Sequence, residues 1–159
     1  MDKPKIMPIS NPMFRDFLKR LTAPAAAPLD QIDARLALGA LLVRVAKSDE
    51  HYDGAEAAKI DQLLSKRYGL NSTQADELRT QCEVLEFEAP DTIRFTRAIK
   101  QVINHEDRVS VIEDLWAVVL ADGTRDADEN TLMRLVANLL GVNDVESAKA
   151  RHRMQADID

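Results

Sequence analysis

Two short segments of the chain gather carboxylates in one pattern, 73 residues apart. We call residues 48–56 the first acidic turn and residues 121–129 the second acidic turn. The matching acids are Asp49, Asp53 and Glu56 in the first turn, and Asp122, Asp126 and Glu129 in the second. Carboxylate oxygens are hard ligands that suit Ca²⁺ or Mg²⁺ better than zinc. The pattern therefore predicts a duplicated, weak site for a divalent cation, with these six acids as metal ligands.

A second interpretation needs no ligand. Asp53 and Asp126 each precede a glutamate by three residues, which is the spacing of a capping box at a helix start. Such a cap stabilises a helix by about 1 kcal/mol. Asp49 and Asp122 instead end the preceding helices, where the helix dipole disfavours a carboxylate by about 0.3–1 kcal/mol. Either a cation or the N–H donors of an Asx-turn would relieve that penalty, so both interpretations stay open.

Hydrophobic periodicity predicts the helices that must position these acids. Apolar residues recur at helical spacing along the chain, which indicates an all-α single domain, a helical bundle of about seven helices. The expected helices cover about 30–48, 54–68, 72–85, 90–103, 105–121, 128–140 and 144–154. The helix over 105–121 is apolar on two adjacent faces, so we expect it to be central and buried. In the helix after the second turn, Leu132, Leu135, Val136 and Leu139 are expected to face inward.

The chain contains an internal duplication. A shift of 73 aligns Arg35 with Arg108 as well as the three acids, and a shift of 72 aligns Gly69 with Gly141. Each copy therefore has a helix, an acidic turn, a second helix, a glycine stop and a third helix. Duplicated helical hairpins pack around a pseudo-two-fold axis, with antiparallel neighbours joined by short turns. Whether both acidic turns reach one edge depends on that axis, which the sequence does not fix.

Length and charge limit the functional classes. With 159 residues the chain can form one domain with a substantial core, which we place at residues 29–155. The net charge is −6, and residues 1–28 carry +3, so the remainder carries −6 − 3 = −9. This acidic body argues against nucleic-acid binding. A single cysteine and the absence of a signal peptide favour the cytoplasm.

Residues 1–28 are expected to form a flexible basic arm. Within it, Phe14 and Phe17 share one face of a short amphipathic helix that also carries Lys19 and Arg20. This helix could make a weak peripheral contact with a membrane, or it could dock on the domain. The Pro- and Ala-containing stretch 22–28 reads as a linker to the domain. Whether Met1 or Met13 begins the functional chain stays open.

No group of residues has the spacing of a catalytic site. The three histidines, His51, His105 and His152, are too far apart in sequence to form a local ligand pair, and Cys82 lies on an apolar helix face where we expect a core residue. Phosphate-binding glycine loops and hydrolase motifs are absent from the sequence. We therefore expect a protein that is not an enzyme. A metal-dependent enzyme that uses paired carboxylates is the third alternative.

The segment from Ala34 to Glu56, the stretch LWAVVLADGTRDADE at 115–129 and the closing LLGV resemble the TerB-like family, that of tellurite-resistance protein B. The resemblance covers roughly residues 30–151. It implies an all-helical duplicated fold, surface acids that bind divalent metal ions, and a cytoplasmic stress role in association with membrane complexes. The six acids match the two family motifs by position. In the first turn Glu50 stands where the family pattern has glycine.

Two functions follow as hypotheses. The leading hypothesis is a non-enzymatic TerB-like protein of metal or oxyanion (tellurite) stress that binds Ca²⁺ or Mg²⁺ at its acidic turns and presents a charged surface to a protein partner. The alternative is a helical protein–protein interaction module in which the acids are only helix caps and the grooves between helices bind the partner.

Overall fold

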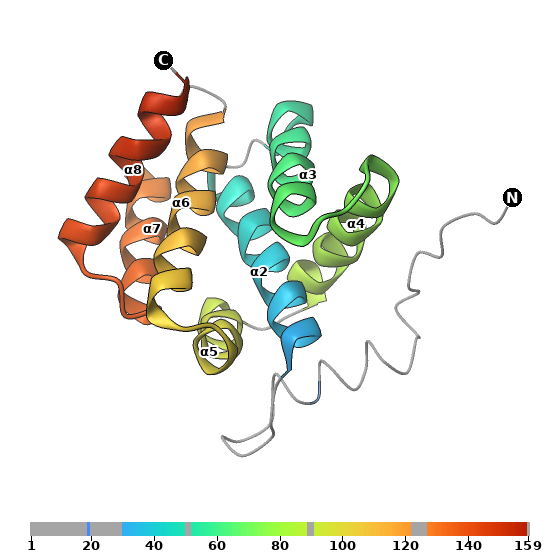
Figure 1. Ribbon diagram of the computed structural model, residues 1–159, viewed down its shortest axis with the longest axis horizontal. Helices are drawn as coiled ribbons and strands as arrows, with labels where there is room; N and C mark the ends of the chain where they lie inside the picture. Colours follow the sequence, from blue (N-terminus) through green and yellow to red (C-terminus); the bar gives the residue numbers. More distant parts are fainter. Residues whose placement is uncertain (1–18, 20–29, 50–51, 89–90, 122–126, 159) are drawn as a thin grey trace, which may run out of the picture.

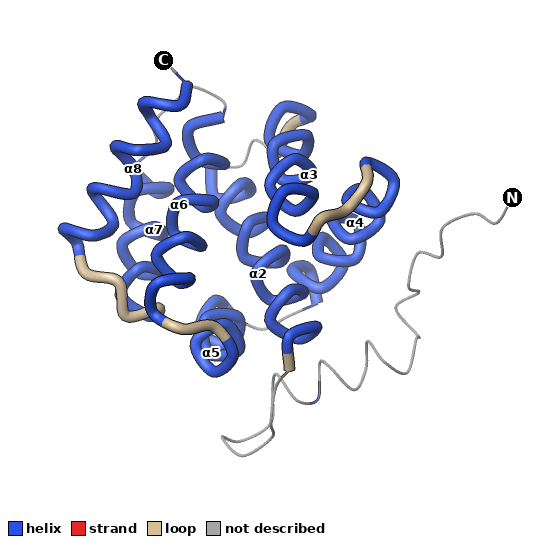
Figure 2. The backbone as a smooth tube through the Cα atoms, viewed as in Figure 1, coloured by secondary structure: helices blue, strands red, loops and turns tan. Residues whose placement is uncertain are grey.

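The computed structural model describes Lys19 and residues 30–49, 52–88, 91–121 and 127–158. For Asp49, residues 127–129 and Ile158 it describes the backbone alone. Apart from Lys19, the predicted N-terminal arm lies outside the described residues. Helices joined by short loops account for the described part of the chain (Figures 1 and 2). Their bounds are α2 Gln31–Ala46, η1 (a 3₁₀ helix) Lys47–Asp49, α3 Gly54–Tyr68, α4 Ser72–Glu88, α5 Thr92–Val102, α6 His105–Ala121, α7 Ala127–Leu139 and α8 Asp144–Ile158.

The all-α prediction is confirmed, and local sequence signals explain most helix ends. Asp30 caps α2 and forms a capping box with Asp33. The Asp30 carboxylate accepts from the Asp33 N–H at 2.9 Å, and the Asp30 N–H donates to the Asp33 carboxylate at 3.2 Å. Gly69 ends α3 with φ +64°, and Gly141 follows α7 with φ +74°. Both lie in the left-handed region that favours glycine. None of the helices within the described ranges is long and apolar enough to cross a membrane.

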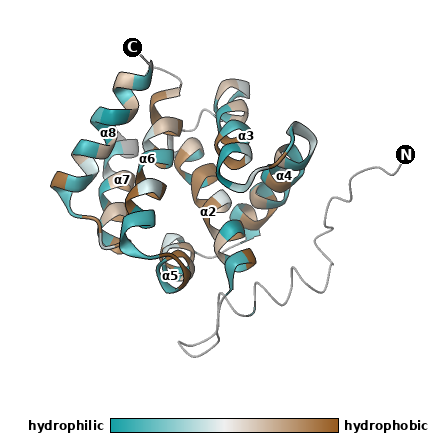
Figure 3. Ribbon diagram, in the orientation of Figure 1, coloured by the Kyte–Doolittle hydropathy of each residue, from teal (hydrophilic) through white to brown (hydrophobic). Residues whose placement is uncertain are grey.

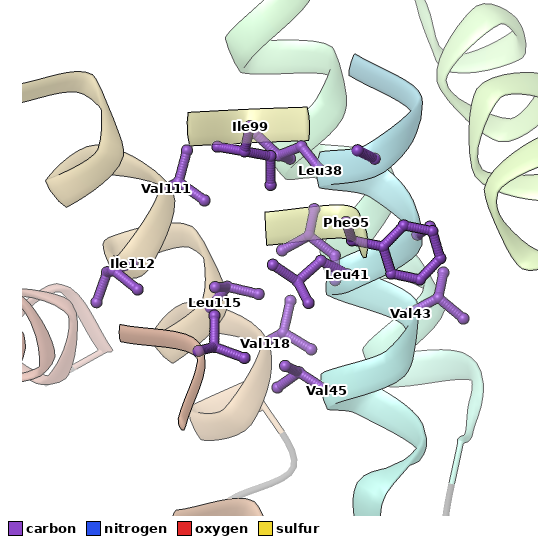
Figure 4. Close-up of a cluster of buried hydrophobic side chains, with 14 of the residues drawn as sticks. Leu38, Leu41, Val43, Val45, Phe95, Ile99, Val111, Ile112, Leu115 and Val118 are labelled. Atoms are coloured by element: carbon purple, nitrogen blue, oxygen red, sulfur yellow. The ribbon is translucent and has the colours of Figure 1, made fainter. Parts of the chain in front are cut away.

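The core forms where α2 packs beside α6. Both helices run in the same direction in Figure 1, and the cluster of side chains between them is drawn in Figure 4. Leu38 and Val111 lie at one end of this cluster, and Val45 and Val118 lie at the other (Figure 4). These are equivalent positions of the duplication, 73 residues apart. The helix 105–121 is buried as predicted, and α2 shares the centre with it.

The duplication recurs in matched local contacts. We call α2–α4 the first unit and α6–α8 the second unit. The third helix of each unit starts with a capping box, formed by Asn71 with Gln74 in the first unit and by Asn143 with Glu146 in the second. In each box the backbone N–H of either residue donates to a side-chain oxygen of the other, at 2.8–3.2 Å. The first helix of each unit sends an arginine to the end of the second helix. Arg35 lies over the Tyr68 ring, 4.4 Å from its centroid, and Arg108 donates to the carbonyl oxygen of Leu140 at 2.8 Å.

The predicted inward face of α7 is wrong in part. Leu135 is 45% exposed, and Leu132 is only half-buried. The face that packs into the core is formed instead by Met133, Val136 and Ala137, one residue further round the helix. Both faces have helical spacing, and the pattern alone favours the one with more leucines. Contacts of α7 with α2, α5 and α6 select the other face.

The first unit is packed unusually closely between α2 and α4. A Cβ atom added to Gly39 would lie 2.2 Å from the Cys82 sulfur, so only glycine allows α4 to approach this near. Cys82 is fully buried, as predicted, and its Sγ lies 3.7 Å from the Leu36 carbonyl oxygen. Burial raises the pKa of this thiol far above its usual value. Cys82 is therefore a core residue without thiolate character at neutral pH.

Candidate functional site

The helix ends that flank both acidic turns lie at one edge of the molecule. Because α2 and α6 run side by side in the same direction, their C-terminal ends point the same way (Figure 1). The 3₁₀ helix η1, which follows α2, packs against α7, and the first residues of α7 are the last residues of the second acidic turn. The sequence did not fix whether the helices that precede the two turns end at the same edge, and the structure shows that they do. Residues 122–126 themselves lie outside the described part.

Asp53 caps α3 as the capping interpretation predicts. Its carboxylate accepts from the Glu56 N–H at 3.1 Å, and its backbone is extended, as is usual at an N-cap. The side chain is exposed to solvent. The predicted return bond, from the Asp53 N–H to the Glu56 carboxylate, is not formed, so only half of the capping box is present.

Glu56 occupies the first turn of α3 but is almost completely buried, at 2% exposure. Carboxylates are rarely buried unless other groups stabilise their charge. Helix capping explains the position of Asp53 but not the burial of Glu56. Of the three predicted ligands in the first acidic turn, the structure describes two side chains: the exposed carboxylate of Asp53 and the buried carboxylate of Glu56.

The other four predicted ligands cannot be assigned a geometry. The side chains of Asp49 and Glu129, and the whole of Asp122 and Asp126, lie outside the described residues. Among the side chains that are described, no three His, Cys, Asp or Glu residues gather into a group that could hold a metal ion.

A polar cluster that sequence reasoning missed anchors the first acidic turn to α4. The hydroxyl of Tyr52 donates to the Glu83 carboxylate. Glu83 also accepts from Arg79 Nη1 at 2.7 Å. The same guanidinium binds Asp61 at 2.6 Å and Asp76 at 2.5 Å. Burial, and then the bond to Glu83, raise the pKa of Tyr52, so this phenol stays a donor at neutral pH.

The sequence carried part of the signal for this cluster. Asp76, Arg79 and Glu83 are spaced i, i+3 and i, i+4 along α4, which places them on one helix face. Asp61 comes from α3 and Tyr52 from the acidic turn, and only tertiary packing brings them to Arg79. The turn that carries Asp53 is therefore fixed to the body of the domain at its own Tyr52.

A shallow groove lies between α3 and α6. Its volume is about 420 Å³, and four of its lining residues are alanines. Those on α3 are Ala55 and Ala58, and those on α6 are Ala117 and Ala121. Small side chains expose the helix backbone and allow another helix to approach closely.

Two units of three helices, with duplicated caps and matched arginines, form an all-α duplicated fold. Residues 35–152 match the family described as "Tellurite resistance protein TerB". The match covers 118 of the 159 residues, so the chain belongs to this family. No curated protein and no solved structure matches the chain.

Proposed function

We propose that this TerB-family chain is a non-enzymatic, cytoplasmic protein of metal or oxyanion stress, tellurite included, that binds a divalent cation at its acidic turns. The observation that carries the proposal is the recurrence of the acids of the first turn, 73 residues later, in the second turn. The exposed carboxylate of Asp53 at the start of α3 supports it. So does the shared direction of α2 and α6, because the C-terminal ends of both helices, after which the acidic turns follow in the sequence, point the same way.

The donor chemistry fits a hard cation. Asp49, Asp53 and Glu56 would supply carboxylate oxygens in the first turn, and Asp122, Asp126 and Glu129 would supply them in the second. Oxygen-only donor sets suit Ca²⁺ and Mg²⁺. An N-cap carboxylate keeps a second oxygen for a ligand, so the bond from the Glu56 N–H to Asp53 is compatible with binding. We expect weak affinity, because acids in exposed turns keep competing water.

Thermal unfolding with and without Ca²⁺ tests this proposal. Ca²⁺ should raise the melting temperature of the wild-type protein, because a ligand that binds only the folded state stabilises it. The double variant Asp122→Asn, Asp126→Asn should lose this shift. A matched control, Glu88→Gln with Asp157→Asn, removes two exposed charges elsewhere and should keep it. An equal shift in both double variants would rule out the acidic turns as the site.

The alanine-lined groove between α3 and α6 favours a second candidate function, the helical interaction module. On this hypothesis a protein partner presents a helix to Ala55, Ala58 and Ala117, and the acids act only as caps. Replacing Ala58 with Trp would then abolish capture of the partner while Asp→Asn changes at the turns leave it intact. Capture that survives the groove change but fails without the acids would remove this candidate.

Membrane contact through the N-terminal arm stays a separate prediction. Phe14, Phe17, Lys19 and Arg20 would supply the apolar and basic groups. The full-length chain should then sediment with vesicles that contain anionic lipid, and the effect should fall as salt is raised. Failure of the full-length chain to sediment with these vesicles removes this part of the hypothesis.

A further inference from the structure

A groove of about 340 Å³ between α7 and α8 is lined by two arginines, Arg134 and Arg151. Arg134 comes from α7 and Arg151 from α8. Arg151 lies over the ring of Trp116, with its Cζ 5.3 Å from the ring centroid. Within the described residues, neither arginine takes part in an ion pair. Two unneutralised guanidinium groups in one groove are unexpected in a chain with a net charge of −6.

The first unit shows what the equivalent arginine binds. The matched boxes at Asn71 and Asn143 align α4 with α8 by a shift of 72, which places Arg79 on Arg151. Arg79 binds three carboxylates, those of Asp61, Asp76 and Glu83, at 2.5–2.7 Å. On α8 the residues at the positions of Asp76 and Glu83 are Ala148 and Gln155, which carry no charge.

The residue on the second helix that faces this arginine is an acid in the first unit and a base in the second. The buried faces of α3 and α7 align by a shift of 73, since Ile60, Leu63 and Leu64 then fall on Met133, Val136 and Ala137. That alignment places Asp61 on Arg134. The positions of the Asp61–Arg79 ion pair of the first unit are thus occupied in the second unit by two arginines, which line one groove from α7 and from α8. Two guanidinium groups that line one groove repel each other, and an anion between them would relieve that repulsion.

We propose that the groove between α7 and α8 binds a small doubly charged oxyanion of the phosphate class. The two guanidinium groups would replace the carboxylate contacts seen at Arg79 with contacts to the anion, since planar guanidinium forks match such oxygens. Neutral donors stand beside them. The amide of Asn130 lines the groove, and the Ser147 hydroxyl, which accepts from Trp116 Nε1 at 3.1 Å, can donate its proton to a ligand. The groove residues are different from the six predicted cation ligands, and the proposal does not rest on cation binding at the acidic turns.

Asp144 is the group in the groove that opposes an anion. It is the first residue of α8 and contributes a carboxylate to the lining. Its charge should weaken binding without preventing it, because two arginines outnumber it. Replacing Asp144 with Asn should therefore tighten binding of the anion.

Fluorescence of Trp116, the single tryptophan of the chain, reports on the groove directly. Inorganic phosphate titrated into the full-length protein at constant ionic strength should change this fluorescence with a saturating curve, and chloride should not. A phosphate monoester, glycerol phosphate, tests whether the groove takes a free anion or the head of an ester. If the groove binds phosphate and glycerol phosphate equally well, its ligand is the phosphate group itself. If it binds glycerol phosphate more tightly, its ligand is a phosphate ester.

Two variants of Arg134 make the test specific. Arg134→Asp restores the acid–base pair of the first unit and should abolish the response. Arg134→Gln removes one charge and should weaken binding roughly tenfold or more, the usual loss with one charge-assisted contact. Lys100→Asp and Lys100→Gln, at an exposed position of α5, make the same charge changes elsewhere and should bind as the wild type does. A wild-type protein without a saturating response, or equal binding by the Arg134 and Lys100 variants, overturns the proposal.

Discussion

Arg79 in the first unit and Arg151 in the second occupy the same position of a duplicated fold, yet their surroundings differ in charge. Arg79 holds three carboxylates and, through Glu83, the hydroxyl of Tyr52. Arg151 has an indole ring beside it and a second arginine across the groove. The two units share backbone features, with a capping box at Asn71 and another at Asn143 and a left-handed glycine after each second helix.

The difference shows which constraints a duplicated fold keeps. Capping groups provide hydrogen-bond partners for the N–H and C=O groups at helix ends, which have no partner within the helix. Both units therefore need them. A charged cluster on a helix face is exchangeable, because its net contribution to stability is small once desolvation is counted. In the first unit Arg79 and Glu83 together fix the acidic turn to α4. In the second unit Arg151 is available to a ligand.

The largest effect is expected at the close contact between α2 and α4. Gly39→Ala should lower the free energy of unfolding by about 3 kcal/mol, because its Cβ would lie 2.2 Å from the Cys82 sulfur in a packed core. Urea unfolding measures this. Adding Cys82→Ala should recover part of the loss. Gly54→Ala is the control, since nothing lies within 4 Å of its new Cβ, and it should be close to neutral.

The next effect separates the two arginines. Arg79→Gln leaves three neighbouring carboxylates without their cation and should cost about 2 kcal/mol, which is below the value for a fully buried pair because Asp76 is largely exposed to solvent. Arg151→Gln removes no ion pair and should cost less than about 1 kcal/mol. Both are measured by chemical unfolding in buffer without phosphate. Equal losses would contradict the contrast between the units.

The smallest effect concerns the capping boxes at Asn71 and Asn143. The hydrogen bond with His105, 2.9 Å long, lowers the pKa of the Glu146 carboxyl below its usual value. A depressed pKa means that the contribution of Glu146 is present above its ordinary pKa and is lost as the pH falls through the lowered value. Gln74, its counterpart, does not titrate. Amide resonances at Asn143 should therefore shift in acid while those at Asn71 stay unchanged, and parallel shifts would contradict this.

Much of the fold could be predicted from the sequence because it depends on local signals. Asp30, Asn71 and Gly69 set helix ends through bonds to nearby backbone groups, and these ends agree with the helix ranges that the hydrophobic pattern predicts. Leu135 was placed on the wrong face because two faces of α7 share the helical period, and only neighbouring helices choose between them.

The candidate site was less predictable. Spacing identified Asp53 as an N-cap, because a capping bond joins residues three apart. The burial of Glu56 and the bond from Tyr52 to Glu83 arise from helices that meet only in the folded chain. The charge reversal from Asp61 to Arg134 is visible in the sequence only after burial has fixed the alignment of α3 with α7.

Amide resonances of the ¹⁵N-labelled full-length protein, followed while Ca²⁺ is added, test the central claim most directly. We predict saturable shifts in residues 49–56 and 122–129 and small changes elsewhere, because the cation binds at the acidic turns. A titration in which neither turn shifts, up to millimolar Ca²⁺ and in the range of weak protein sites, would contradict it. The acids would then be helix caps alone.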